Sequence, residues 1–142
     1  MRNFAKNLFL LSTICLWAGC ATQTPRQVLE AEESQVKLRS IQSRAFDTAD
    51  KEKTMRTVIA TLQDLDFLIE NADLMLGTVT GEKFSKNVVI RMTVTVRPKN
   101  ATQMIVRANA QYGLSAVETP EPYQDFFMAL EKAMFLTAQQ VD

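Results

Sequence analysis

The sequence contains no histidine, and this absence removes several functions at once. Histidine is the most frequent general base in enzymes, a frequent zinc ligand and the ordinary switch for pH near neutrality. The serine, threonine and lysine side chains stand in no Gly-x-Ser-x-Gly context that would mark a nucleophile. We therefore predict a protein that is not an enzyme, with no catalytic residue, no metal site and no cofactor.

Neither sign of charge is in excess, since the chain has 16 basic and 16 acidic residues. Proteins that bind nucleic acid usually carry a basic patch together with aromatic side chains that stack on bases. No aromatic residue lies between Arg91, Arg97 and Arg107, which are the arginines of the most regular strand patterns. We therefore predict no nucleic-acid partner.

A long apolar run is also missing, but a short one lies near the start of the chain. Arg2 and Lys6 precede the run from Leu8 to Leu16, and small residues follow it at 18 and 19. A bilayer core requires about 20 apolar helical residues, so this run is too short to span one. A cationic start, a short apolar run and small residues are typical of an export signal. We predict that residues 1–19 are removed.

The segment Leu16-Trp17-Ala18-Gly19-Cys20 resembles the lipobox of bacterial lipoprotein precursors, usually Leu-Ala/Ser-Gly/Ala-Cys. Trp17 departs from that pattern, because the leucine stands four residues before the cysteine and not three. The resemblance implies cleavage before Cys20, acylation of its thiol with chains such as palmitate, and acylation of the new amine. An aspartate at position 21 would retain such a protein at the inner membrane. Ala21 occupies this position, so the resemblance implies sorting to the outer membrane, with the domain facing the periplasm.

Cysteine is scarce, and acylation would use the last free thiol. Cys15 lies in the predicted signal, so the mature chain keeps only Cys20 and has no disulfide. Its stability must then come from a hydrophobic core. Residues 20–35 are polar and contain Pro25, a composition that predicts a tether between the acylated Cys20 and the domain. Two or three acyl chains would hold such a protein at a membrane almost permanently. Residues 36–142 are expected to form one domain.

The pattern after residue 35 predicts an α+β domain. Alternation at 88–97 and 102–112, with Ile105 as the exception on the polar face, indicates two paired strands, each with one apolar and one polar face. Apolar residues at helical spacing predict two amphipathic helices. In order, we expect an edge strand at 36–46, a helix at 49–65, strand segments at 67–69 and 74–80 separated by a polar interruption, a loop at 81–87, the paired strands, and a helix at 122–139.

The expected fold is a single antiparallel sheet of three to four strands with both helices on one face. Its element order, β-α-β-β-β-α, resembles that of the helix-grip domains of BamC, the lipoprotein subunit of the outer-membrane β-barrel assembly machinery. The resemblance covers about residues 36–139 and rests on element order alone. It implies an accessory or scaffolding role.

Two other patterns favour ordinary structure over chemistry. Gly77 and Gly81 are separated by three residues, whereas a phosphate-binding loop requires four and then Lys directly before Ser or Thr. We expect a strand that ends in a turn. The second pattern is a group of carboxylates without the ligand spacing of a calcium loop, which we expect to be solvated: Asp64, Asp66, Glu70 and Asp73.

The polar face of the two paired strands is the candidate partner-binding surface. Arginine binds carboxylates and phosphates through paired hydrogen bonds, so the face fits an acidic protein surface, lipopolysaccharide phosphates or peptidoglycan. An ordinary solvated sheet face is the alternative. We predict a lipid-anchored accessory that binds an envelope protein through this face or through an open sheet edge. The face consists of Arg91, Thr93, Thr95, Arg97, Arg107 and Asn109.

An aromatic stripe on the last helix leaves a second function open. Phe126, Phe127 and Met134 recur at helical spacing, which favours packing in the core. The same stripe would fit a cavity between the C-terminal helix and the sheet. The alternative function is therefore a carrier or sensor of a small apolar or lipid ligand.

Overall fold

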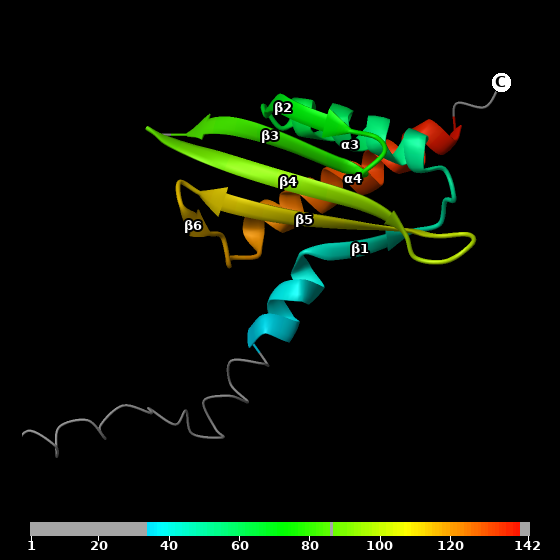
Figure 1. The fold of residues 1–142 in the computed structure, drawn as a ribbon, viewed down its shortest axis with the longest axis horizontal. Helices are drawn as coiled ribbons and strands as arrows, with labels where there is room; N and C mark the ends of the chain where they lie inside the picture. The colour runs from blue at the N-terminus through cyan, green and yellow to red at the C-terminus, as the bar shows by residue number, and fades with distance from the viewer. Residues whose placement is uncertain (1–33, 86, 140–142) are drawn as a thin grey trace, which may run out of the picture. The chain divides into compact units, whose positions relative to one another are not determined.

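An antiparallel sheet with two long helices packed against it forms the domain, in a computed structural model that describes residues 34–85 and 87–139 (Figure 1). Across the sheet the strands run β1-β5-β4-β3-β2, every pair is antiparallel, and β6 pairs with the far end of β5. The elements are β1 (Ser43–Phe46), α3 (Lys51–Asp64), β2 (Leu68–Asp73), β3 (Thr78–Ser85), β4 (Val88–Pro98), β5 (Met104–Tyr112), β6 (Ser115–Ala116) and α4 (Glu121–Gln139).

The predicted α+β class, both long helices and the hairpin of β4 and β5 are confirmed. The predicted sheet of three to four strands is wrong, because the sheet has five strands and the short β6. The order is consequently β-α-β-β-β-β-β-α. The predictions for the signal, for Cys20 and for the tether up to residue 33 lie outside the described residues.

The predicted interruption at residues 70–73 is part of β2, and the chain turns later, at residues 74–77. Polar residues fit here because β2 pairs with β3 alone and lies at the edge of the sheet, where charges and bulges are tolerated. Its register shifts between Ile69 and Asn71. Gly77 closes the turn at φ 70°, where a Cβ atom would lie 2.4 Å from the Val96 carbonyl oxygen.

The predicted loop at residues 81–87 is also wrong, because β3 continues to Ser85 and pairs with β4 up to Val88. Two of its charged residues fit within the strand because their side chains have partners. Glu82 accepts a hydrogen bond from Arg91 across the strand pair. The Nζ atom of Lys83 donates to the Leu65 carbonyl oxygen at 2.9 Å.

Only the end of the predicted edge strand at 36–46 is a strand, since residues 34–41 are helical and β1 is short. Leu38 and Ile41 are three residues apart, a spacing that places both on one side of a helix. Ile41 packs against the core, and β1 then pairs with β5 from Ser43 to Phe46. The prediction was wrong because two apolar residues at helical spacing, in a short segment with charged neighbours, cannot be distinguished from an irregular strand by sequence pattern.

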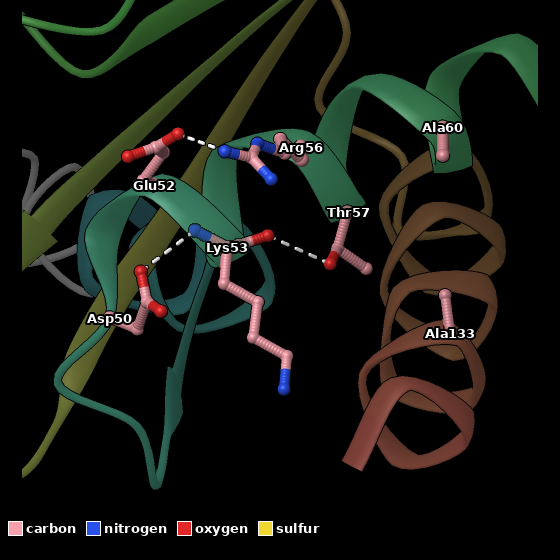
Figure 2. Close-up of a pocket in the computed structure, with 7 residues that line it drawn as sticks. All are labelled: Asp50, Glu52, Lys53, Arg56, Thr57, Ala60 and Ala133. Atoms are coloured by element: carbon pink, nitrogen blue, oxygen red, sulfur yellow. Dashed lines mark hydrogen bonds and ion pairs between the residues drawn. The ribbon is translucent and has the colours of Figure 1, made fainter. Parts of the chain in front are cut away.

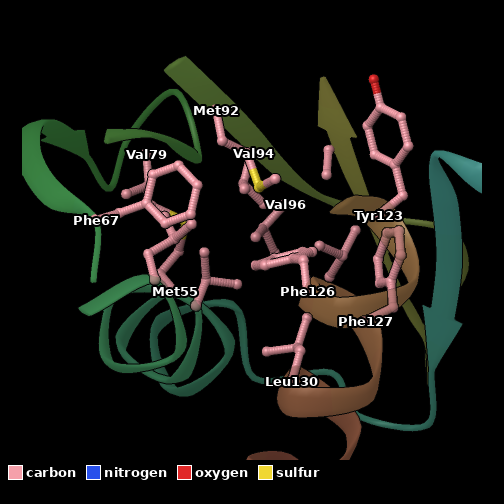
Figure 3. Packing of buried hydrophobic residues seen from close by; sticks show 14 of the residues in the cluster. Met55, Phe67, Val79, Met92, Val94, Val96, Tyr123, Phe126, Phe127 and Leu130 are labelled. Carbon is pink, nitrogen blue, oxygen red and sulfur yellow. The ribbon is translucent and has the colours of Figure 1, made fainter. Parts of the chain in front are cut away.

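The core lies between α3, α4 and the inner face of the sheet (Figure 3). The apolar side chains expected to share one face of β4 and β5 do so; seven of them are buried, and Val88 and Ile90 are partly buried. The aromatic stripe of α4 packs on them. Phe126 and Phe127 contact each other edge to face, with ring centroids 5.1 Å apart. The residues from β4 and β5 are Met92, Val94, Val96, Met104, Val106, Ala108 and Ala110.

Three threonines of α3 also belong to its buried side, including Thr57, which the helical wheel places away from the apolar stripe. Each hydroxyl donates to a carbonyl oxygen four residues earlier in the same helix, so only the methyl group is left for packing. Hydrogen bonding within the helix therefore makes these threonines behave as small apolar residues. The other two are Thr54 and Thr61.

Tyr123 ties α4 to three other parts of the domain. Its side chain is fully buried, and its hydroxyl donates to the Val117 carbonyl oxygen at 2.6 Å. The same oxygen accepts hydrogen bonds from the Ala110 backbone N–H at 3.2 Å and from Gln42 Nε2 at 3.1 Å. Gln42 joins the helical residues 34–41 to β1, so the hydroxyl also holds the N-terminal side of the domain in place.

Replacing this hydroxyl tests that role. Tyr123→Phe should lower the free energy of unfolding by about 2 kcal/mol, because buried partners lose their hydrogen bonds without gaining water. Urea unfolding followed by circular dichroism measures the change. Tyr112→Phe is the matched control, since Tyr112 is partly exposed and its hydroxyl has no hydrogen-bond partner among the described residues. An equal loss in both variants would contradict the account.

Candidate functional site

The outer face of the sheet, the one turned away from α3 and α4, holds all six residues predicted to bind a partner. Thr93 lies opposite Asn109, and Thr95 lies opposite Arg107. Side chains alternate along β4, so its arginines at 91 and 97 project from the same face as these threonines. The three arginines and Asn109 are exposed, and the two threonines are half-buried.

Arg91 lies at one end of this face and is already paired. Its Nε atom donates to Glu82 Oε1 at 2.8 Å and lies 3.5 Å from Glu70 Oε2. Two carboxylates therefore more than balance one guanidinium. An anionic partner would have to displace both, so we remove Arg91 from the candidate site. The pairing was not predicted from the sequence, because Glu82 was expected in a loop and Glu70 in the polar break between two strand segments.

The other two arginines line a shallow hollow of about 310 Å³, which we call the arginine hollow: Thr95, Arg97, Ile105, Arg107 and Asn109. Arg107 lies opposite Thr95 and Arg97 opposite Ile105, so the arginines are diagonal neighbours on adjacent strands. The Nε atom of Arg107 donates to Ser43 Oγ at 3.1 Å. Within residues 34–85 and 87–139, neither arginine has a carboxylate partner, and Arg97 has no side-chain hydrogen bond.

The chemistry of the arginine hollow is that of an anion-binding site. Two neighbouring guanidinium groups repel each other, and a carboxylate or phosphate between them offsets this repulsion while accepting paired hydrogen bonds. Thr95 and Asn109 add a hydroxyl and an amide, and Ile105 adds apolar surface. These groups are suited to binding an anion.

The acidic cluster from the sequence is dispersed by the fold. Asp66 lies 3.6 Å from the Nζ atom of Lys83, and Glu70 lies beside Arg91. Asp73 accepts a hydrogen bond from the Leu76 backbone N–H at 2.8 Å, which stabilises the turn between β2 and β3. Among the described residues, no three acidic, histidine or cysteine side chains are grouped so as to hold a metal ion.

The glycine pattern belongs to the sheet. Gly77 ends the turn before β3, and Gly81 lies inside β3 against Phe67. Sequence analysis also overlooked a Ser-x-x-Lys spacing at Ser34 and Lys37, a pair used by some hydrolases. Both residues are exposed in the helical segment, and no hydrogen bond joins their side chains. The spacing alone supports no nucleophile.

A larger open groove of about 520 Å³ lies between α3 and α4 (Figure 2). Most of its charged and polar groups already have partners, whereas the Lys53 ammonium group has none among the described residues. Asp50 caps α3 by accepting from the Lys53 backbone N–H, Glu52 pairs with Arg56, and the Thr57 hydroxyl donates to the Lys53 carbonyl oxygen. Alanines at 60 and 133 complete the lining. Apart from that ammonium group, the groove has few polar groups left to bind a ligand.

The aromatic stripe of α4 lies within the core. Phe126, Phe127 and Leu130 are fully buried, and Met134 packs against the same cluster. The guanidinium of Arg44 covers the outer side of the Phe127 ring, 5.2 Å from its centroid, and also pairs with Glu131. The packing therefore supports the core interpretation of this stripe over a ligand cavity.

Cys20, the predicted lipidation site, lies outside the described residues. None of the helices in the described ranges is long and apolar enough to cross a membrane. Comparison with known proteins adds no assignment, since no protein family and no characterised protein sequence matches this chain.

Proposed function

We propose that this protein is an outer-membrane lipoprotein, acylated at Cys20, that serves as a non-enzymatic accessory in an assembly of the bacterial envelope. Its domain faces the periplasm and binds an acidic surface of a protein partner. The observation that carries the proposal is the arginine hollow, in which Arg97 and Arg107 lie side by side on an exposed sheet face and have no carboxylate partner in the part of the chain that the structure describes.

The three arginines of the outer sheet face differ in their partners. Arg91 is exposed like its neighbours, yet the fold supplies it with two carboxylates. Arg97 and Arg107 receive none among the described residues, so their mutual repulsion remains until an external anion binds. Charge complementarity of this kind gives an interface its specificity and speeds encounter between partners.

The arrangement of the elements gives weaker support by analogy. The element order on which the resemblance to the helix-grip domains of BamC rested is not the order of this fold, because two further strands are present. The likeness is limited to a long C-terminal helix packed on an antiparallel sheet. Folds host many functions, so the likeness supports an accessory role without naming a partner. An anchor also concentrates the domain at the membrane surface, where even a modest contact with a neighbouring envelope protein becomes populated.

Photo-crosslinking in intact cells tests the proposal. A photoreactive amino acid placed at Asn109 lies in the arginine hollow and should give one discrete adduct with an envelope protein. Mass spectrometry of the adduct should identify a crosslinked peptide rich in Asp and Glu. The same amino acid at Ala72, on the open edge of β2, tests the edge as the contact.

The control position is Gln124, which is exposed on α4, on the helical side of the domain. We expect no adduct from it. Adducts at Ala72 alone would move the contact to the sheet edge. Crosslinks to lipopolysaccharide or peptidoglycan would show a different anion in the hollow, and the absence of any specific adduct at Asn109 would refute the proposed partner.

A further inference from the structure

Three large apolar side chains are exposed together at one end of the sheet. Phe84, near the end of β3, is 71% exposed, Leu114 in the turn before β6 is fully exposed, and Tyr112 at the end of β5 is 45% exposed. We call these three residues the apolar end. Soluble domains seldom group such side chains without a function, and contact with a membrane or another protein is the usual one.

The strand register places these residues at the same end of the sheet, with Phe84 and Tyr112 on opposite faces, because their partners Val89 and Ile90 are consecutive residues of β4. Phe84 lies opposite Val89 on β4, and the Gly113 backbone N–H donates to the Val89 carbonyl oxygen at 3.0 Å. Leu114 follows that glycine, so β3, β4 and the turn before β6 are adjacent here. Figure 1 shows the end of β3, the start of β4 and this turn at the left of the view.

The described chain begins near the same end. Ser34 and Leu38 line a hollow together with Glu118 and Pro120, which belong to the connection that follows β6. Fourteen residues, 20–33, precede this point, and a chain of that length reaches at most about 50 Å at full extension. A chain anchored at Cys20 would therefore keep this end of the domain within that distance of the membrane.

We propose that the apolar end is a second membrane contact, which inserts Phe84 and Leu114 into the interfacial layer of the lipid bilayer that holds the acyl chains. This inference rests on the proposed acylation of Cys20. Aromatic and aliphatic side chains are favoured at the bilayer interface, and their binding strength grows with the apolar area that they bury. Three side chains bind weakly alone, but a short tether supplies a high effective concentration of lipid surface.

The consequence is a defined orientation of the domain. With the apolar end in the bilayer, the strands stand upright on the membrane. The arginine hollow, which includes Arg97 near the opposite end of β4, is then held away from the lipid and accessible from the side. The second contact would thus present the hollow to a neighbouring protein.

Fluorescence measures this orientation directly, because Trp17 is the only tryptophan and precedes the predicted cleavage site. The full chain carrying Phe84→Trp or Leu114→Trp would be processed in cells, purified and reconstituted in vesicles of phosphatidylethanolamine and phosphatidylglycerol with brominated acyl chains. Bromine quenches an indole inside the bilayer. We expect both indoles to lose most of their emission and to shift to shorter wavelength.

The matched control is Ala101→Trp, in the exposed turn between β4 and β5 at the opposite end of the sheet. Ala101 is exposed, so its indole should emit as in water. Quenching at all three positions would show adsorption without orientation and would overturn the inference. Vesicle-bound protein with no quenching at 84 or 114 would also overturn it and leave the apolar end to a protein partner.

Flotation and fluorescence distinguish a missing acyl anchor from a missing second membrane contact. If the processed protein does not float with the vesicles, the acyl anchor is absent and the proposed function fails first. If it floats while the indoles at 84 and 114 remain in water, the anchor holds and the second contact is wrong.

Discussion

Cys20→Ser should abolish incorporation of labelled palmitate and remove the protein from the outer-membrane fraction. Each methylene of an acyl chain buried in a bilayer contributes about 0.8 kcal/mol, so two or three chains make dissociation negligible. Serine offers no thiol for the acyl chains, and the membrane-bound population should fall almost completely. Metabolic labelling and fractionation of the envelope measure the two effects.

The chain provides a matched control for this substitution. Cys15→Ser changes the only other thiol, which lies inside the predicted signal, and should leave palmitate labelling and membrane localisation as in the wild type. A Cys20→Ser protein that is still labelled and still migrates as the wild type would show that Cys20 is not the lipidated residue.

The sequence predicted the parts of the fold whose pattern depends on one face being buried. The strands β4 and β5 alternate, apart from Val89 and Ile105 on the outer face, because α3 and α4 cover one side of the sheet. Both helices show an apolar stripe for the same reason. The pattern weakens wherever burial is incomplete. The edge strand β2 and the outer part of β3 carry charged residues, and both were partly mistaken for loops.

The candidate site could be predicted only in part, because local pattern does not report contacts between distant strands. Alternation alone places Arg91, Arg97 and Arg107 on one face. Only the register between β3 and β4 reveals that Glu82 lies opposite Arg91 and neutralises it. Hydrogen bonds also change the character of a residue, as with Thr57, whose hydroxyl is satisfied within its own helix.

Reversing the charge of the arginine hollow should have the second large effect. Arg97→Glu with Arg107→Glu replaces two cations by two anions on a surface proposed to bind carboxylates. Loss of the attraction and the new repulsion should weaken binding by at least about tenfold, equivalent to about 1.4 kcal/mol. Folding should be little affected, because both side chains are exposed and neither forms an ion pair among the described residues.

A control with the same change of charge separates local from overall effects. Arg39→Glu with Lys132→Glu alters the net charge equally, and both residues are exposed away from the arginine hollow, on the helical residues 34–41 and on α4. This control should keep wild-type binding.

The most direct test of the proposed function is the yield of the photo-adduct from Asn109 in these two backgrounds. We predict that the yield falls at least about tenfold when Arg97 and Arg107 are reversed and stays unchanged in the control. An undiminished adduct in the reversed variant, or an equal fall in the control, would show that the arginine hollow does not recognise the partner.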